Sequence, residues 1–199
     1  MGNVESNEYL TEDDLNFCKK NTRYNEEEIK TWYSSFKKDC PSGVLTKEKF
    51  VDVYKLFFPR GNAENFCNHV FRTFDTDKNG EINFVEFLLA INVTLSGTVL
   101  ENLKYAFKLY DVDGNGLIDQ GEMNRIILAI CELIGEENEV EENLEQKYTP
   151  EERTRMIFSQ MDTNGDGYLT EEEFIQGCEK DNELSKLLGL YLLEPGGGE

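Results

Sequence analysis

Apolar side chains recur along the chain at intervals of three and four residues, which is the period of an amphipathic α-helix. Short polar stretches rich in Asp, Asn and Gly interrupt these helical segments. Phe71 and Phe74 lead into one such stretch at residues 75–86, and Phe87 and Leu88 follow it. The pattern predicts a helix–loop–helix unit, and its recurrence predicts an all-α protein built from repeats of that unit.

Capping residues mark several of the expected helix starts. Asn25 is followed three residues later by Glu28, and Thr149 is followed by Glu152, which is the spacing of a capping box. Pro150 stands at the first helical position, where its fixed φ angle suits a helix start. We therefore expect helices to begin just after Asn25 and Thr149.

Residues 75–86, 111–122 and 162–173 each match the twelve-residue calcium loop of an EF-hand. Calcium takes six to eight oxygens at about 2.3–2.6 Å, supplied by side chains at positions 1, 3 and 5, the carbonyl at position 7 and a glutamate at position 12. Three Ca²⁺ sites are expected, with Mg²⁺ as a competitor. The predicted ligand residues are Asp75, Asp77, Asn79, Glu81, Glu86, Asp111, Asp113, Asn115, Leu117, Glu122, Asp162, Asn164, Asp166, Tyr168 and Glu173.

Two further positions complete each loop. Glycine at position 6 permits the sharp bend, because it has no Cβ to resist a left-handed conformation. Position 9 is polar, and Asn83 is expected to reach an ion through a water molecule. The bend and position-9 residues are Gly80, Gly116 and Gly167, and Asn83, Asp119 and Thr170.

Residues 38–49 keep the frame of such a loop without its ligands. Gly43 occupies the bend, but Lys38 and Lys49 replace the first and last carboxylates. Pro41 also fixes a backbone angle and removes an N–H group. We expect this loop to bind no calcium.

The disabled loop still has a structural use, because EF-hands pair. Position 8 of one loop forms a short β-bridge with position 8 of its partner, which predicts contacts of Leu45 with Ile82 and of Ile118 with Leu169. The fold expected is therefore four EF-hands in two paired lobes, of which three loops are functional.

Composition divides the chain along the same lines. The N-terminal lobe is expected over residues 1–93, a hinge linker over 94–98 and the C-terminal lobe over 99–193, followed by a tail at 194–199. Residues 135–148 are rich in glutamate and are expected to form an acidic linker inside the C-terminal lobe.

The charge balance limits the classes of partner. The formal net charge is −20, from 40 acidic and 20 basic residues, which disfavours nucleic acid as a ligand. Five scattered cysteines without a C-x-x-C pair suit a reducing, cytoplasmic setting. No run of about 20 apolar residues suggests a membrane span.

The chain starts Met1-Gly2-Asn3-Val4-Glu5-Ser6, which matches the pattern for N-myristoylation at Gly2. Such short patterns also occur by chance. If Gly2 is acylated, a single myristoyl chain gives only reversible membrane binding. The expected localisation is then cytoplasmic and reversibly membrane-associated.

No catalytic machinery is evident. His69 is the single histidine, and no nucleophile, phosphate-binding loop or zinc ligand set accompanies it, so the protein is not expected to be an enzyme. Twelve of the 23 aromatic residues lie between Trp32 and Phe87, which exceeds the need of a small core and suggests an apolar groove for a lipid or a partner helix. The alternatives are an ordinary aromatic core and a plain calcium buffer.

The chain resembles the neuronal calcium sensor family over nearly its whole length. The matching stretches include "NTRYNEEEIKTWYSSFKKDCPSG", "YKLFFPRGNA", "HVFRTFDTDKNGEINFVEF" and "TPEERTRMIFSQMDTNGDGYLTEEEF". The resemblance implies an acylated N-terminus and hinge-like roles for Gly43 and Gly97. It also implies a groove for target helices lined by Tyr24, Trp32, Tyr54, Phe57, Phe84 and Phe87.

The resemblance leaves the target open. The three functional loops and the acidic insertion are similar to the photoreceptor regulators of membrane guanylate cyclase, and "WYSSFKKDCPSG" is more similar to recoverin and frequenin. A membrane guanylate cyclase is the favoured target, with activation or inhibition undecided. The alternatives are a receptor kinase, a lipid kinase, a channel, or a constitutive enzyme subunit of the calcineurin type. Homodimerisation stays open.

Overall fold

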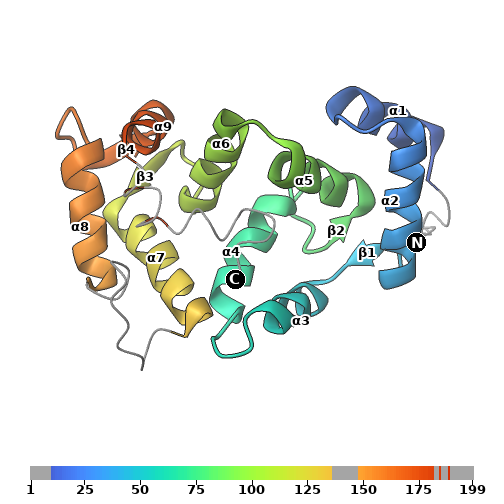
Figure 1. Cartoon of the computed structure of the whole chain (residues 1–199), viewed down its shortest axis with the longest axis horizontal. Helices are drawn as coiled ribbons and strands as arrows, with labels where there is room; N and C mark the ends of the chain where they lie inside the picture. The colour runs from blue at the N-terminus through green and yellow to red at the C-terminus, as the bar shows by residue number, and fades with distance from the viewer. Residues whose placement is uncertain (1–9, 136–147, 182–183, 185–187, 189–199) are drawn as a thin grey trace, which may run out of the picture.

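The computed structural model describes residues 10–135 and 148–181, together with Leu184 and Leu188. Within these residues the chain is predominantly helical, as predicted (Figure 1). The helices are α1 (Glu12–Asn21), α2 (Glu26–Asp39), α3 (Lys47–Phe57), α4 (Glu64–Phe74), α5 (Phe84–Ser96), α6 (Val99–Tyr110), α7 (Gln120–Ile134), α8 (Pro150–Met161) and α9 (Glu171–Lys180). The strands are β1 (Val44–Leu45), β2 (Ile82–Asn83), β3 (Leu117–Asp119) and β4 (Tyr168–Thr170).

The strands join the hands in two antiparallel pairs. β1 pairs with β2 so that Leu45 faces Ile82, and β3 pairs with β4 so that Ile118 faces Leu169. Both predicted contacts are therefore confirmed. Three of these four side chains are completely buried, so each bridge also anchors the core of its lobe.

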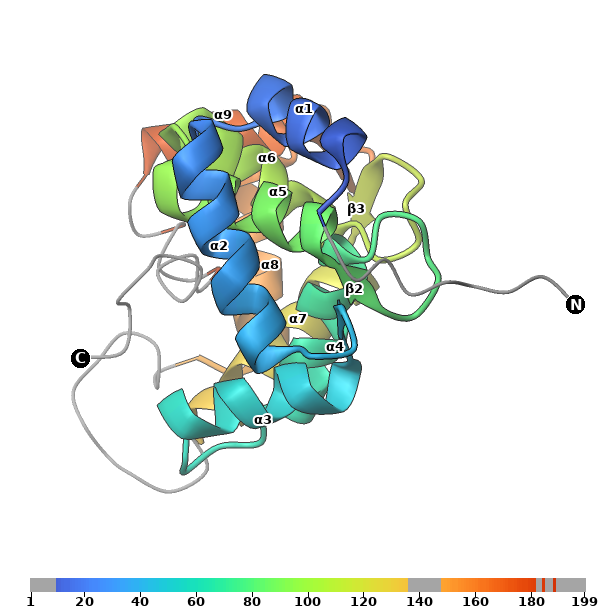
Figure 2. The same ribbon diagram turned by 90° about the vertical axis from the view of Figure 1, so that its right-hand side faces the viewer.

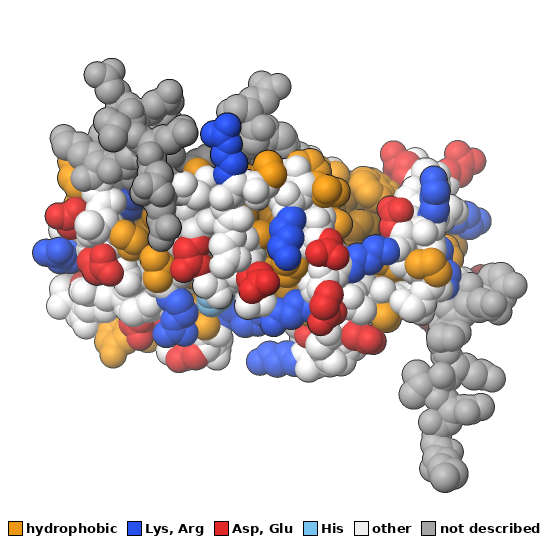
Figure 3. All heavy atoms as spheres, turned by 90° about the horizontal axis from the view of Figure 1, so that it is seen from below, with side chains coloured by type: hydrophobic (Ala, Val, Ile, Leu, Met, Phe, Trp, Pro, Cys, Tyr) orange, Lys and Arg blue, Asp and Glu red, His pale blue; other side chains and the backbone are white. Residues whose placement is uncertain are grey.

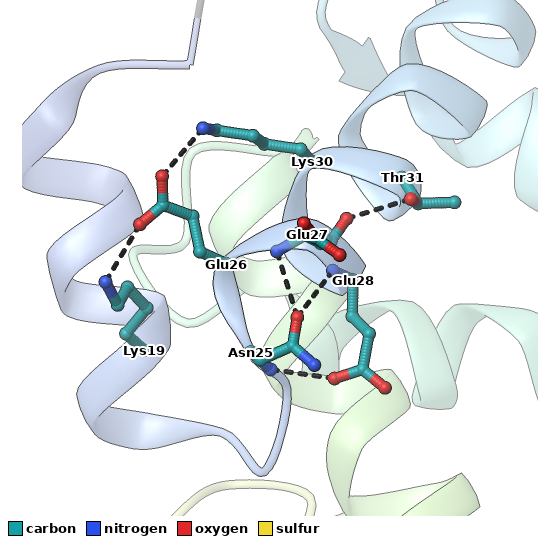
Figure 4. A network of polar contacts seen from close by, with 7 residues as sticks. All are labelled: Lys19, Asn25, Glu26, Glu27, Glu28, Lys30 and Thr31. Atoms are coloured by element: carbon teal, nitrogen blue, oxygen red, sulfur yellow. Dashed lines mark hydrogen bonds and ion pairs between the residues drawn. The ribbon is translucent and has the colours of Figure 1, made fainter.

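The capping residues start the helices as predicted. The Asn25 side chain accepts hydrogen bonds from the N–H groups of Glu27 and Glu28, and Glu28 bonds back to the N–H of Asn25 (Figure 4). Thr149 and Glu152 form the same reciprocal pair around the first turn of α8. Each box satisfies N–H groups that a helix start leaves without a partner.

The connection between the lobes is shorter than expected. Helix α5 continues through Ser96, because no helix-breaking residue occurs before Gly97, and Thr98 already caps α6. The linker expected at 94–98 is thus reduced to Gly97 and Thr98. The lobes also contact each other directly, for example through an ion pair of 2.5 Å between Arg23 and Glu101.

Several expectations concern segments outside the described residues. They are the acylation site at Gly2, most of the acidic linker 135–148 and most of the C-terminal segment. Leu184 and Leu188 are described, and both are buried. The hydroxyl of Tyr110 donates a hydrogen bond to the Leu188 carbonyl, which fixes this point of the chain against the C-terminal lobe.

All five cysteines lie in the described residues, and none forms a disulfide. Among the helices that the structure describes, none is long and apolar enough to cross a bilayer.

Candidate metal centre

In the loop 75–86, backbone N–H groups orient the carboxylates. Asp75 accepts hydrogen bonds from the N–H groups of Asn79 and Gly80, at 3.0 and 2.9 Å. Glu86 reaches back from α5 to the N–H groups of Thr76 and Asp77, at 2.9 and 3.2 Å. The carboxylates at the first and last ligand positions, Asp75 and Glu86, thus both point into the interior of the loop.

The loop 111–122 repeats this geometry closely. Asp111 accepts from the N–H groups of Asn115 and Gly116 at 3.1 and 3.0 Å. Glu122 accepts from Val112 and Asp113 at 2.9 and 3.0 Å. Both loops therefore hold their first and last carboxylates in the same arrangement, as is expected of two calcium loops.

The loop 162–173 differs from the other two at positions 3 and 5, where the order of Asp and Asn is reversed. Asp162 accepts from the N–H of Gly167 at 2.9 Å, and Glu173 accepts from the N–H of Thr163 at 3.3 Å. Position 3 is Asn164, whose amide donates to Asp166 at 3.0 Å. Because position 5 is Asp166 where the other loops have Asn, the side chains at positions 1, 3, 5 and 12 are two Asp, one Asn and one Glu in all three loops, with the same formal charge.

The carboxylates of the first two functional loops lie close enough to share an ion. Asp75, Asp77 and Glu86 form one group whose oxygens lie within 4.8 Å of one another. A second group, made of Asp111, Asp113 and Glu122, does the same, and the described residues contain no third group that meets this distance. Carboxylate oxygens at this separation are the donor set that calcium prefers.

Position 7 is placed consistently in all three functional loops. The N–H groups of Glu81, Leu117 and Tyr168 donate to the position-5 side chain at 2.8, 2.8 and 2.9 Å. These bonds fix the backbone of the residue whose carbonyl is the expected ligand.

Position 9 has a role that the sequence interpretation missed. Asn83, Asp119 and Thr170 each accept a hydrogen bond from the N–H of the closing glutamate, and that glutamate bonds back to their own N–H. They are the N-caps of α5, α7 and α9. The signal was present, because each stands three residues before a glutamate, which is the spacing of a capping box.

The disabled loop, residues 38–49, keeps the bend of the other three loops but differs from them in its hydrogen bonds. Gly43 is left-handed at φ +87°, close to Gly80 at +86°. Its N–H donates to the Cys40 carbonyl, however, and not to a carboxylate. The functional loops also place position 4 in the left-handed region, at Lys78, Gly114 and Gly165, which Pro41 cannot adopt because its ring fixes φ near −65°.

The predicted groove residues fall into two aromatic groups, one on and beside α2 and α5 and the other on α3. Figure 2 shows α2 beside α5, with α3 below them. Trp32 on α2 contacts Tyr24 and, across to α5, Phe87, with both pairs of ring centroids 6.1 Å apart. Tyr54 on α3 packs instead with Phe50, Phe58 and Phe66.

Two of the predicted groove residues differ sharply in exposure. Phe57 is 72% exposed, whereas Phe84 is only 5% exposed and packs against Tyr33 and Phe36. Phe84 therefore belongs to the core of the N-terminal lobe, and Phe57 belongs to its surface.

His69 lies half-buried on α4, within the field of several cations (Figure 3). Burial is the main cause that lowers its pKa to about 4, and Arg72, Arg125 and Lys47 lower it further. The imidazole is therefore neutral near pH 7.

The pKa of His69 predicts a pH effect on stability. Its ordinary pKa is 6.5, so between pH 6.5 and 4 the unfolded chain binds a proton that the folded chain refuses, and stability falls as the pH falls. Between pH 7 and 5 this contribution should amount to about 1 kcal/mol, allowing for screening of a half-buried group. Urea unfolding of wild type and His69→Gln at both pH values measures it, and an identical pH dependence in the two proteins would contradict the assignment.

The sequence is similar to those of known EF-hand proteins. The chain matches the EF-hand domain pair family twice, over residues 41–91 and 100–179. It is 41% identical to S-modulin of Aquarana catesbeiana over 188 residues, covering 94% of this chain and 92% of that protein. It is 39% identical to human recoverin over 188 residues, covering 94% and 93%, and 44% identical to neuronal calcium sensor 1 of Lymnaea stagnalis over 181 residues, covering 91% and 93%. The chain therefore belongs to the neuronal calcium sensor family of EF-hand proteins.

Proposed function

We propose that the protein is a calcium sensor without catalytic activity of its own, which binds three Ca²⁺ ions and regulates a membrane-associated target. The position of the closing glutamates supports this proposal most strongly. Glu86 lies on the first turn of α5 and already bonds to the opposite end of its loop. An ion that takes both of its oxygens must draw the whole exiting helix with it.

The surface that such a movement alters is aromatic. Trp32 on α2, Phe87 on α5 and Tyr24 just before α2 are half-buried. Leu56 and Phe57 on α3 are 80% and 72% exposed. Apolar surface of this kind suits the apolar face of an amphipathic helix, with aromatic side chains as anchors. A pure buffer has no use for it.

The favoured target is a membrane guanylate cyclase, and the direction of regulation is undecided. The three functional loops and the acidic segment before α8 support this choice. The similarity to S-modulin, recoverin and neuronal calcium sensor 1 favours neither a cyclase nor a kinase or channel. The proposal therefore rests on sequence features beyond those shared with recoverin and S-modulin.

An activity assay separates these targets. Photoreceptor membranes that contain guanylate cyclase are assayed with the full chain at low and at saturating calcium. We expect cyclase activity to change with calcium for the wild type and not for a variant with Glu86, Glu122 and Glu173 all replaced by Gln. A calcium response of a receptor kinase with no response of the cyclase would replace the target, and a response of neither with no binding of an apolar dye would leave a buffer.

Membrane association is proposed to occur through a myristoyl group on Gly2. Intact mass of the protein from cells that express an N-myristoyltransferase should increase by one fatty acid, and Gly2→Ala should abolish the increase. An unmodified mass for the wild-type chain would contradict the proposal. Co-sedimentation with vesicles then shows whether attachment depends on calcium.

A further inference from the structure

Helix α4 of the N-terminal lobe lies against α6 and α7 of the third hand, which belongs to the other lobe (Figure 1). Hydrogen bonds join it to this hand at both ends. Just before and within its first turn, the N–H of Asn62 donates to the Glu132 carbonyl at 2.7 Å, and the Asn65 amide donates to the Glu132 carboxylate at 2.6 Å. Glu132 lies on α7, the helix that leaves the loop 111–122. At the other end, Arg72 reaches α6, the helix that enters the same loop.

The Arg72 guanidinium caps the C-terminal end of α6. One terminal nitrogen donates to the carbonyl of Leu109 at 2.7 Å and to that of Lys108 at 3.3 Å. The other donates to the carbonyl of Asp111 at 2.9 Å and to that of Val112. The last carbonyls of a helix lack partners within the helix and carry its negative dipole end, so a rigid cationic fork binds them well.

The position of Arg72 links two ion sites. Three residues after it, α4 gives way to Asp75, the first ligand of the loop 75–86. Its guanidinium meanwhile holds the backbone of Asp111, which is the first ligand of the loop 111–122. A single side chain on a stiff helix therefore connects the first ligand residues of two loops in different lobes.

We propose that Arg72 is a positioning residue that couples the loops 75–86 and 111–122, so that calcium in one raises the affinity of the other. An ion in the first loop fixes the C-terminal end of α4 and with it the guanidinium. The backbone of Asp111 is then ordered in advance, and the second ion meets a smaller ordering cost. The effect is reciprocal, because coupling free energy between two binding sites is shared equally.

The inference rests on calcium binding at these two loops and does not depend on the target. The loops can be followed separately, because the N–H groups of Gly80, Gly116 and Gly167 each donate to the first aspartate of their own loop. Amide resonances of these glycines during a calcium titration of the full chain report the affinity of each loop.

The test is a cycle of variants. Glu122→Gln removes calcium binding from the loop 111–122. In the protein that keeps Arg72, this change should weaken calcium binding at the loop 75–86 by at least about 5-fold. In an Arg72→Gln background the same substitution should change that affinity less than twofold. Arg155→Gln is the matched control, because within the described residues Arg155 donates only to the Glu151 carbonyl of its own helix. The coupling should persist in this variant.

Three results would overturn the inference. They are the absence of coupling in the Arg72 protein, coupling that survives Arg72→Gln, and an equal loss of affinity in all three loops, which is the mark of a purely structural role. If Arg72→Gln does not fold, Arg72→Lys serves instead, because an ammonium cannot reproduce the fork and should reduce the coupling. Failure of calcium binding itself would appear as no glycine shift at all and would count against the proposed function.

Discussion

Glu86→Gln is expected to remove calcium binding from the loop 75–86 and to leave one ion fewer on the chain. The glutamate at position 12 supplies two charged oxygens, and an amide supplies one neutral oxygen in their place. Changes to groups that only support metal ligands cost about 10–100-fold in affinity, so loss of a ligand should cost more. Calorimetry should show a stoichiometry of two in place of three, and the Gly80 amide should no longer shift.

Glu81→Gln is the matched control in the same loop. Glu81 is exposed and is expected to bind the ion through its backbone carbonyl, so its side chain should matter little to the ion. The two variants carry the same change of charge, and simple electrostatics would weaken binding equally in both. An equal loss in Glu81→Gln and Glu86→Gln would therefore contradict the ligand assignment.

Gly61→Ala is expected to destabilise the protein by about 3 kcal/mol or to separate the two lobes. A Cβ at Gly61 would lie 1.7 Å from the Leu133 carbonyl oxygen, 2.3 Å from its carbon and 2.6 Å from the Glu132 carbonyl oxygen. These are backbone atoms at the C-terminal end of α7, so no side-chain rotation relieves the clash. Urea unfolding measures the free-energy change, and small-angle scattering shows whether the lobes move apart.

Gly121→Ala provides the comparison. A Cβ there meets only the Asp119 carboxylate at 3.2 Å, and alanine has the higher helix propensity at this position in α7. We expect a change near zero. If the two variants changed the free energy of unfolding equally little, the close packing of Gly61 against the end of α7 would be contradicted.

The ion loops could be predicted from sequence because coordination chemistry fixes their spacing. Oxygen donors must recur at set positions within twelve residues, and a glycine must take the bend. The bridges of Leu45 with Ile82 and of Ile118 with Leu169 followed from the same register. Capping at Asn25 and Thr149 followed from residues that lie within one helical turn.

Features that depend on distant segments could not be predicted in this way. Arg72 bonds to carbonyls 36 to 40 residues further along the chain, and backbone carbonyls leave no mark in the sequence. Phe84 and Phe57 are chemically alike, and only packing makes one core and the other surface. The end of α5 at Ser96 was set by the first glycine and not by the change in composition.

The most direct test of this account is a calcium titration of the full chain followed by NMR. The amides of Gly80, Gly116 and Gly167 should shift to saturation while that of Gly43 stays in place, and the Trp32 and Phe87 ring signals should move with them. Ions that fill the loops and leave Trp32 and Phe87 unchanged, or a Gly43 amide that shifts as the others do, would contradict it.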